Sequence, residues 1–415
     1  MISDRRVVIT GLGCITSLAE SAESLFDALC RGQSGISTIE SFDTSSFAVH
    51  FGGEIKNFNI DKTIGTREGK RMDRFTQMAL VSAIQAVEDS GLDFEKENKD
   101  RAGVIIGTGI GGIQEIEEQY LRLIQKGPRK VSAFCVPKLM GNAASGCVSI
   151  QYGLRGTNFC VVTACASASH AIGEAFYNIL CDRSDIVIAG GSEAALSPIG
   201  LASFCALKSL STRNDEPQRA SRPFDVDRDG FVLSEGAAVL ILEEYEHAKR
   251  RGAKIYAEIL GYGATGDGFH ITAPLEDGSG AARAMEEALR QARLRPDQID
   301  YINAHGTSTQ LNDVAETLAI KNVFGQHAYK LAVSSTKSCL GHSLGASGGI
   351  ELLVCAKTIE KGRIHPTVNL DRVAPECDPN MDYVPGQARD KKVTYALSNS
   401  LGFGGHNSCL IIGKV

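Results

Sequence analysis

Several features that would restrict the function of this chain are missing from its sequence. It has no tryptophan and no uncharged apolar run near the ~20 residues that a membrane-spanning helix needs, so we expect no membrane insertion. The formal net charge is −6, which argues against nucleic acid as the main partner. With 43% hydrophobic and 22% charged residues, the composition is that of an ordinary globular protein.

The cysteines also lack a pattern. Twelve of them are scattered along the chain without a C-x-x-C pair, which predicts reduced thiols rather than a disulfide framework or a zinc site. Residues 1–6 show no signal-peptide pattern. We therefore expect a cytoplasmic protein that binds no metal.

Strand and helix patterns alternate, and their order repeats. In the first half, buried strands are expected at 6–13, 102–112, 184–191 and 237–244. Helices are expected at 22–30, 75–90, 113–125 and 134–152. In the second half, similar strand, loop and helix patterns recur at 255–263, 300–309, 331–360, 395–405 and 408–413. The repeat predicts two similar α/β halves with helices on both faces of the sheets.

Cys165 lies where two β-branched residues end a strand and small residues lead into a helix that runs to about Leu180. The N-terminus of a helix offers free N–H groups and a positive dipole, both of which favour a thiolate. This position makes Cys165 a candidate nucleophile. The alternative is a buried core cysteine, since free cysteines are among the most buried residues.

Two histidines also follow predicted strands, His305 in HGTST and His342 in KSCLGH. Ligands of α/β folds bind at the carboxyl ends of strands, so we expect both histidines on the same face as Cys165. A cysteine and two histidines could instead bind zinc, but the chain offers no close pair of ligands. Phe403 lies among three glycines, a natural place for an aromatic ring that moves.

A third possibility comes from Gly107, Gly109 and Gly112, which match G-x-G-x-x-G between a strand and a helix. This pattern is typical of a nicotinamide dinucleotide site. No acidic residue ends a second strand about twenty residues further on, as such sites require, so the match is weak.

Four motifs occur in order along the chain: TACASA around Cys165, HGTST, KSCLGH and GFGGHN, with the block RPFDVDRDGFVLSEGA between the first two. Together they resemble the β-ketoacyl-acyl-carrier-protein synthases of the thiolase superfamily, most closely the synthase II group of dissociated fatty acid synthesis. The resemblance covers essentially the whole chain. It departs from many relatives at Cys339-Leu340, where they have Met and Thr, and at Cys135, where they have an aromatic residue.

The resemblance implies a thiolase-like α/β fold, in which two duplicated βαβαβαββ halves form α-β-α-β-α layers. Residues 1–250 would carry the nucleophilic cysteine together with cap and dimer insertions, and residues 251–415 the two histidines. It also implies a homodimer built around the strand before Cys165.

The implied reaction is a decarboxylative Claisen condensation. An acyl group would pass to Cys165, malonyl-acyl-carrier protein would lose CO2, and a 3-oxoacyl-carrier protein two carbons longer would leave. The resemblance assigns His305 and His342 to the enolate, Lys337 and Glu351 to orienting the histidines, and the backbone N–H groups of Cys165 and Phe403 to the oxyanion. It implies no cofactor, because phosphopantetheine arrives on the carrier protein.

The resemblance also assigns contacts to the substrates. The pantetheine arm would be held by Thr307, Thr309 and Thr272. Phe403 would gate an acyl tunnel whose lining includes Ile110, Phe204 and Cys135. Acidic acyl carrier protein would be bound by Arg67, Lys70, Arg71 and Lys208.

Two alternatives within the same family remain open. The first is the ketosynthase of a polyketide or specialised-lipid cluster, with the same chemistry. The second is a non-catalytic chain-length partner; such proteins lose the nucleophile, so the presence of Cys165 argues against it.

Overall fold

The computed structural model describes residues 5–415, so Met1–Asp4 of the predicted N-terminal segment lie outside the described part. The strands of the first half are β1 (Val7–Thr16), β4 (Ala102–Gly107), β5 (Asn158–Val161), β6 (Ile186–Glu193) and β7 (Gly236–Glu244). Those of the second half are β8 (Ala257–Gly266), β9 (Tyr301–Asn303), β10 (Ala332–Ser334), β13 (Tyr395–Gly402) and β14 (His406–Gly413).

The two halves have the same strand order. The strand order of the sheet is β10-β9-β13-β14-β8-β1-β7-β6-β4-β5. Counted outward from the junction between β1 and β8, corresponding strands of the two halves follow in the same order. In both halves the first two pairings from the junction are antiparallel and the last two are parallel. The halves meet where Val7–Ile9 pairs with Ala257–Ile259. The predicted duplication is confirmed.

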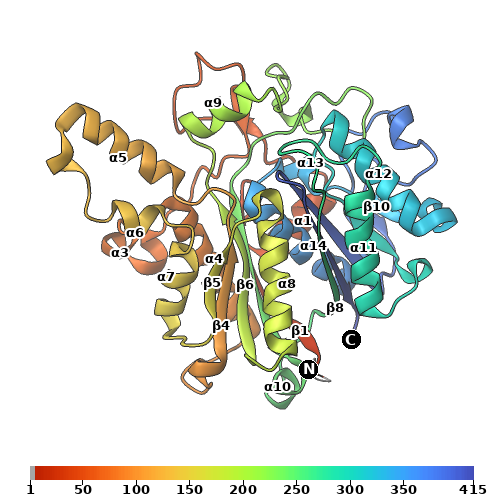
Figure 1. Cartoon of the computed structure of the whole chain (residues 1–415), viewed down its shortest axis with the longest axis horizontal. Helices are drawn as coiled ribbons and strands as arrows, with labels where there is room; N and C mark the ends of the chain where they lie inside the picture. The colour runs from red at the N-terminus through yellow and green to blue at the C-terminus, as the bar shows by residue number, and fades with distance from the viewer. Residues whose placement is uncertain (1–4) are drawn as a thin grey trace.

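Helices form three layers around these strands (Figure 1). The long helices of the first half are α1 (Ala22–Cys30), α4 (Arg74–Ser90), α5 (Ile113–Lys126), α7 (Ala143–Tyr152) and α8 (Ser167–Leu180). Those of the second are α11 (Ser279–Ala292), α12 (Gln310–Phe324) and α14 (Ser347–Lys361). Helices α8 and α14 pack together between the halves, α4 and α7 cover the first half, and α11 and α12 cover the second. The predicted α-β-α-β-α layering is confirmed.

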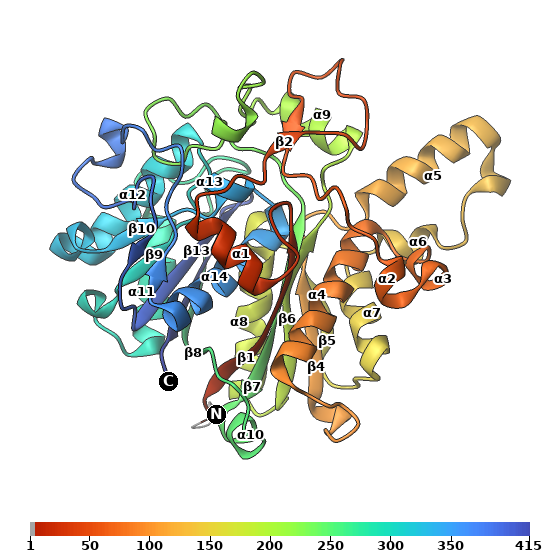
Figure 2. The same cartoon turned by 180° about the vertical axis from the view of Figure 1, so that it is seen from behind.

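Short elements decorate this core. They are the helices α2 (Asp61–Ile64), α3 (Thr66–Gly69), α6 (Cys135–Leu139), α9 (Pro198–Ala206), α10 (Tyr245–Arg250) and α13 (Lys337–Leu340), with the two-residue strand pairs β2–β3 (Ser37–Thr38, Phe51–Gly52) and β11–β12 (Arg363–Ile364, Arg389–Asp390). Helix α5 projects from the molecule as an arm, and α6 returns beneath it (Figures 1 and 2).

The local signals explain most boundaries. Strands β1 and β7 are buried along their whole length, because helices cover both faces, and this is why they read as continuous apolar runs. Asp73 caps α4 by accepting a hydrogen bond from the Phe75 N–H, and Gly91 ends the helix in the left-handed region. The helices expected at 22–30, 75–90 and 113–125 are confirmed to within one residue.

Two element predictions are wrong. The strand expected at 102–112 ends at Gly107, because the following residues turn to meet a buried carboxylate described below. The helical stretch expected at 134–152 is two helices, interrupted at residues 140–142 around Gly141. All twelve cysteines are unpaired. Within residues 5–415, no helix has both the length and the apolar character to cross a membrane.

Candidate active site

Cys165 lies in a tight turn, Ala164–Ala166, between β5 and α8. Ala164 has a φ of 50°, a left-handed conformation that residues with a side chain rarely adopt. The hydroxyl of Ser167, the first residue of α8, holds the turn: its Oγ lies 2.7 Å from the Ala164 carbonyl oxygen and accepts a hydrogen bond from the Thr163 N–H at 2.9 Å. The turn directs Cys165 into a cavity.

Gly402 brings the end of β13 to this turn. A Cβ atom at position 402 would lie 2.7 Å from the Thr163 carbonyl oxygen and 3.3 Å from the Cys165 nitrogen, so no larger residue fits without displacing the backbone. The close approach places the N–H of Phe403 within hydrogen-bonding reach of the Cys165 sulfur, beside the N–H of Cys165 itself. The two groups predicted to form an oxyanion hole therefore converge on one atom.

The ionisation of Cys165 differs from the expectation. Burial raises the pKa of its thiol to about 12, while the Lys337 charge and the two N–H groups oppose that rise without cancelling it. Burial thus acts against the thiolate that the helix start favours. The helix start favours the anion, but loss of solvent around the sulfur is the larger effect.

His305 and His342 face each other across the cavity, with ring centroids 5.3 Å apart and ring planes at 86°. Lys337 Nζ lies 3.2 Å from His305 Nδ1, and because an ammonium group can only donate, Nδ1 accepts and the proton sits on Nε2. His342 Nδ1 lies 2.9 Å from the hydroxyl of Ser347, which can donate in the same way. Both rings can therefore present an Nε2–H donor.

Both imidazoles are neutral at physiological pH. Burial and the nearby charge of Lys337 hold the pKa of each ring well below its usual value of 6.5, and His342 contributes further to the lowering at His305. A neutral imidazole donates a hydrogen bond without carrying a charge of its own. The pair is thus suited to stabilise an anion that forms during a reaction.

Lys337 and Glu351 form a buried ion pair next to the histidines. Lys337 begins α13 and Glu351 lies on α14, and both side chains are almost fully enclosed. Burial raises the pKa of Glu351, and Lys337 opposes the rise. The structure thus brings together all five residues predicted to form the catalytic centre.

Glu316 holds the backbone of His305, a role that the sequence did not reveal. Its two carboxylate oxygens accept hydrogen bonds from the N–H groups of His305 and Gly306, each at 2.8 Å, and Asn399 Nδ2 donates to it at 3.2 Å. Burial raises the pKa of Glu316 to about 7. The available signal was a pair of acidic residues, Asp313 and Glu316, spaced three apart just after HGTST.

Cys165 and both histidines open into one cavity of about 470 Å³. The other predicted site residues that line this cavity are Ile110, Phe204, Lys208, Thr272, Thr307, Thr309 and Phe403. The ring centroid of Phe204 lies 5.4 Å from that of Phe231, which in turn lies 5.4 Å from that of His342, so an aromatic wall connects the predicted tunnel to the histidines.

The remaining predicted residues lie apart from the cavity lining. Cys135 is half-buried on α6 and is not among the lining residues of the single chain. Arg67, Lys70 and Arg71 are exposed on and just after α3, with the Arg71 guanidinium 5.4 Å from the ring centroid of Phe134. Figures 1 and 2 both draw α3 beside α6 and away from α9, which ends two residues before Lys208.

The glycine-rich loop after β4 is already occupied by a side chain. Glu193 accepts hydrogen bonds from the N–H groups of Gly109 at 2.6 Å and Ile110 at 3.3 Å, and from the Thr108 hydroxyl at 3.0 Å. A buried carboxylate thus takes the amides that a pyrophosphate would need, which argues against the nicotinamide alternative. Among residues 5–415, no cluster of three His, Cys, Asp or Glu side chains could hold a metal ion.

Known proteins match this chain over its whole length. The family model for the beta-ketoacyl synthase N-terminal domain matches residues 4–248, and that for the C-terminal domain matches residues 256–371. The chain is 50% identical over 413 residues to a 3-oxoacyl-[acyl-carrier-protein] synthase 2 of Synechocystis sp., covering 100% of this chain and 99% of the relative. It is 49% identical over 416 residues to a protein with the same name from Vibrio cholerae, covering 100% of each.

Solved structures give the same result. A ketosynthase of a type II polyketide synthase, in complex with its acyl-carrier protein, superposes with a TM-score of 0.92 at 35% identity over 99% of each chain. A beta-ketoacyl synthase from Burkholderia phymatum superposes with a TM-score of 0.92 at 37% identity, over 99% of this chain and 100% of the other.

Proposed function

Since the chain belongs to the β-ketoacyl synthase family, and is thus an acyltransferase that condenses malonyl-acyl-carrier protein with an acyl group, we propose that Cys165 carries the acyl group and that His305 and His342 act on the malonyl thioester. One observation supports this assignment above the others. The cysteine sulfur, two backbone N–H donors and two neutral imidazoles meet in a single buried cavity.

In the first half-reaction, Cys165 Sγ attacks the acyl thioester and the phosphopantetheine thiol leaves. The thiol proton of Cys165 passes to the leaving sulfur, so the enzyme ends uncharged at this position. The N–H groups of Cys165 and Phe403 stabilise the oxyanion of the tetrahedral intermediate, and one such donor typically contributes about 3–4 kcal/mol.

In the second half-reaction, the bond between the malonyl carbon and its carboxylate breaks and CO2 leaves. The electron pair moves to the thioester oxygen as an enolate, which accepts hydrogen bonds from Nε2–H of His305 and His342. Lys337 keeps the His305 proton on Nε2, and Glu351 balances the Lys337 charge. The enolate carbon then attacks the acyl-Cys165 carbonyl and a C–C bond forms. The Cys165 sulfur leaves as a thiolate and takes up one proton from solvent, which restores the thiol.

The fatty acid substrate class is favoured over the polyketide alternative. The 3-oxoacyl-[acyl-carrier-protein] synthase 2 relatives are 48–50% identical to this chain over its full length. The type II polyketide ketosynthase described above is 35% identical, and a ketosynthase/chain length factor structure is 33% identical. The product is therefore a 3-oxoacyl-acyl-carrier protein extended by two carbons.

Substrate contacts follow from the cavity lining. Thr272, Thr307 and Thr309 would hold the pantetheine arm, with the hydroxyls of Thr307 and Thr309 only 2.9 Å apart. Ile110 and Phe204 would line the acyl tunnel, with Phe403 as its gate. Lys208 would be the first basic contact of the acidic carrier protein at the rim of the cavity, with Arg67, Lys70 and Arg71 forming a second site next to α6.

A homodimer would cover the apolar surface next to β5. This strand lies at the edge of the sheet, and Phe159 and Val162 are exposed there. The arm formed by α5 exposes a further row of large apolar side chains: Ile116, Tyr120, Leu121, Leu123 and Ile124. A second copy would pair its β5 with this edge and bury the arm, which would also place Cys135 of α6 at the interface. The reduced cysteines support a cytoplasmic location.

Mass spectrometry tests the assignment directly. The protein is incubated with an acyl-acyl-carrier protein, digested, and its cysteine-containing peptides are weighed; we expect the acyl group on Cys165 alone. Addition of malonyl-acyl-carrier protein should then discharge the acyl group into a 3-oxoacyl product and release CO2. Acylation of a different cysteine, or discharge without CO2, would overturn the proposal.

A further inference from the structure

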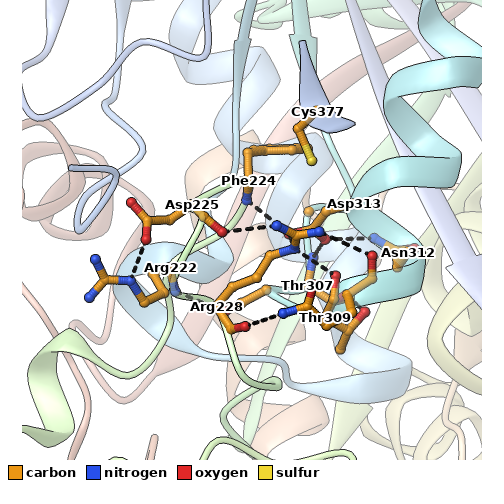
Figure 3. A network of polar contacts seen from close by, with 12 residues as sticks. Arg222, Phe224, Asp225, Arg228, Thr307, Thr309, Asn312, Asp313 and Cys377 are labelled. Carbon is orange, nitrogen blue, oxygen red and sulfur yellow. Dashed lines mark hydrogen bonds and ion pairs between the residues drawn. The ribbon is translucent and has the colours of Figure 1, made fainter. Parts of the chain in front are cut away.

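A buried arginine from the first half of the chain reaches the loop that carries the two pantetheine threonines in the second half (Figure 3). Arg228 lies in the RPFDVDRDGF loop, and its side chain is fully enclosed. Arginine is rarely buried without partners for its charge, because that charge cannot be removed by deprotonation. Its contacts show what it holds.

The guanidinium of Arg228 donates to backbone carbonyl groups on both loops. Nε donates to the Thr309 oxygen at 3.2 Å and Nη2 to the Gln310 oxygen at 3.1 Å. Nη1 donates to the Asp225 oxygen at 2.9 Å within its own loop. Gln310 Nε2 donates back to the Arg228 carbonyl. These bonds fix the backbone just after Thr309 relative to the first half.

Asp313 holds the same loop at Thr307. One of its oxygens accepts a hydrogen bond from the Thr307 N–H at 3.1 Å, and the other accepts from the Phe224 N–H at 2.9 Å. Arg228 Nε lies 3.8 Å from this carboxylate and compensates its charge. Figure 3 shows the two threonines next to both the arginine and the aspartate.

The residue between the threonines is held in a strained conformation. Ser308 has a φ of 73°, in the left-handed region that favours glycine. The same first-half loop supports it, because the Arg222 N–H donates to Ser308 Oγ at 3.0 Å and the Gly230 N–H donates to the Ser308 carbonyl at 3.1 Å. A strained residue persists only when its surroundings determine its position, and here two of the contacts that do so come from residues 221–230.

We propose that Arg228 is a positioning residue for the pantetheine arm. It does not touch the substrate; it sets the position of the Thr307 and Thr309 hydroxyls so that both face the cavity at the spacing that the amides of the arm require. This inference rests on the proposed function, in which these hydroxyls bind the arm. The first half thus controls how the second half recognises the carrier.

The test compares two acyl donors that differ in the arm. One is butyryl-pantetheine, which has the amides, and the other is S-ethyl thiobutyrate, which has none. Cys165 acylation is measured by mass spectrometry for the wild type, Arg228→Lys, Thr309→Ala and the double variant. Lysine keeps the charge but cannot span the three carbonyl groups, so the KM for butyryl-pantetheine should rise about 10-fold, as expected for the loss of one or two hydrogen bonds. Acylation by S-ethyl thiobutyrate and alkylation of Cys165 by iodoacetamide should not change.

Arg222→Lys is the matched control. Arg222 is a buried arginine of the same loop, but its side chain contacts Asp225 and Asp371, and its contact to Ser308 comes from the backbone. Arg222→Lys should leave the ratio of the two KM values unchanged. If Arg228 acts through Thr309, the double variant should lose less than the product of the two single losses.

The outcomes separate the inference from the proposed function. If the wild type and Thr309→Ala accept both donors equally well, the pantetheine contact itself is wrong. If Thr309→Ala discriminates between the donors and Arg228→Lys does not, or if the two losses multiply fully, the positioning role is wrong. If Arg228→Lys does not fold, Asp313→Asn replaces it, and an unchanged KM for butyryl-pantetheine in that variant overturns the proposal.

Discussion

The turn before α8 and the turn before α14 occupy equivalent places in the two halves. They have similar backbone conformations, but their middle residues differ in chemistry. Residues 164–166 and 344–346 both form a single tight turn immediately before the central helix of their half. Their first residues, Ala164 and Leu344, have φ values of 50° and 44°. A serine follows each turn. The middle residue is Cys165 in one half and Gly345 in the other.

The surroundings of the two middle residues explain this difference. Cys165 opens into the cavity, whereas a Cβ atom on Gly345 would lie 2.3 Å from the Gly109 nitrogen and 2.7 Å from Glu193 Oε2. The Gly345 N–H instead donates to that carboxylate at 3.1 Å. Duplication supplied two facing turns of the same strained shape. One carries the proposed nucleophile, and the other forms a packing contact between the halves.

Replacing Cys165 should have the largest effect and tests the difference between the two turns most directly. Cys165→Ala should lower condensation on the order of 10³-fold or more, because the covalent intermediate can no longer form. Condensation assays together with mass spectrometry of the acylated peptide check this. Cys147→Ala, which removes a thiol outside the cavity lining, should keep full activity. Substantial residual activity in Cys165→Ala would mean that the turn does not carry the nucleophile.

Replacing the histidines tests whether the second half contributes to decarboxylation. His305→Ala and His342→Ala should each slow decarboxylation about 10²–10³-fold, the usual cost of removing one donor to an oxyanion. Acyl loading should persist, because it uses the Cys165 thiol and the N–H groups of Cys165 and Phe403 and neither histidine. Release of labelled CO2, measured separately from transacylation, decides this. Normal decarboxylation in both variants would remove the histidines from the mechanism.

The ion pair of the second half has no counterpart at the turn of the first. Lys337→Met should lower the free energy of unfolding by about 3–5 kcal/mol, because it leaves the Glu351 carboxylate buried without its partner. Urea unfolding measures the change. The double variant Lys337→Met with Glu351→Gln should recover part of the loss. An equal loss in the single and double variants would show that packing, rather than the charge, carries the effect.

Gly345→Ala tests whether the second turn tolerates a side chain at its middle position, where the first turn has one. We expect a loss of about 1–3 kcal/mol in the free energy of unfolding, because the added methyl group meets the backbone of Gly109. Gly146→Ala is the matched control: this helical glycine has open space around its Cβ position, so alanine should be neutral or slightly stabilising. Equal stability of the two variants would contradict the packing role of Gly345.

The smallest effect is expected at the surface. Lys208→Glu should raise the KM for acyl-carrier protein a few-fold, and the effect should fade with added salt, since a rim charge acts mainly through screened attraction. Reaction with a free acyl-pantetheine should not change. Comparison with Arg67→Glu, which reverses a charge on α3, will show whether the separate basic cluster also contributes. Identical losses with both donors would point to a structural fault instead.

The fold was largely predictable, because its signals are local. Alternating strand and helix patterns, repeated along the chain, are sufficient to predict two similar halves, and the motifs around Cys165, His305 and His342 mark the ends of strands that meet on one face. The break between α6 and α7 was missed, since a single Gly141 within a helical pattern does not by itself end a helix.

The parts that could not be predicted depend on distant neighbours. The Cys165 pKa depends on how completely other elements enclose the sulfur, which a strand-to-helix motif does not reveal. The hydrogen bond between Arg228 and Thr309 joins residues 81 positions apart. Glu193, two residues beyond the strand expected at 184–191, accepts hydrogen bonds from loops of both halves.

The open side of β5 also has a consequence for how the chain must be made. Within the described residues this strand pairs only with β4, so its outer row of backbone groups is a template for any other extended chain. With exposed apolar side chains beside it, an unassembled molecule is prone to aggregate. In the proposed homodimer, folding and assembly would be linked by mass action, so the melting temperature would fall on dilution, and rapid synthesis would favour precipitation unless partner copies met quickly.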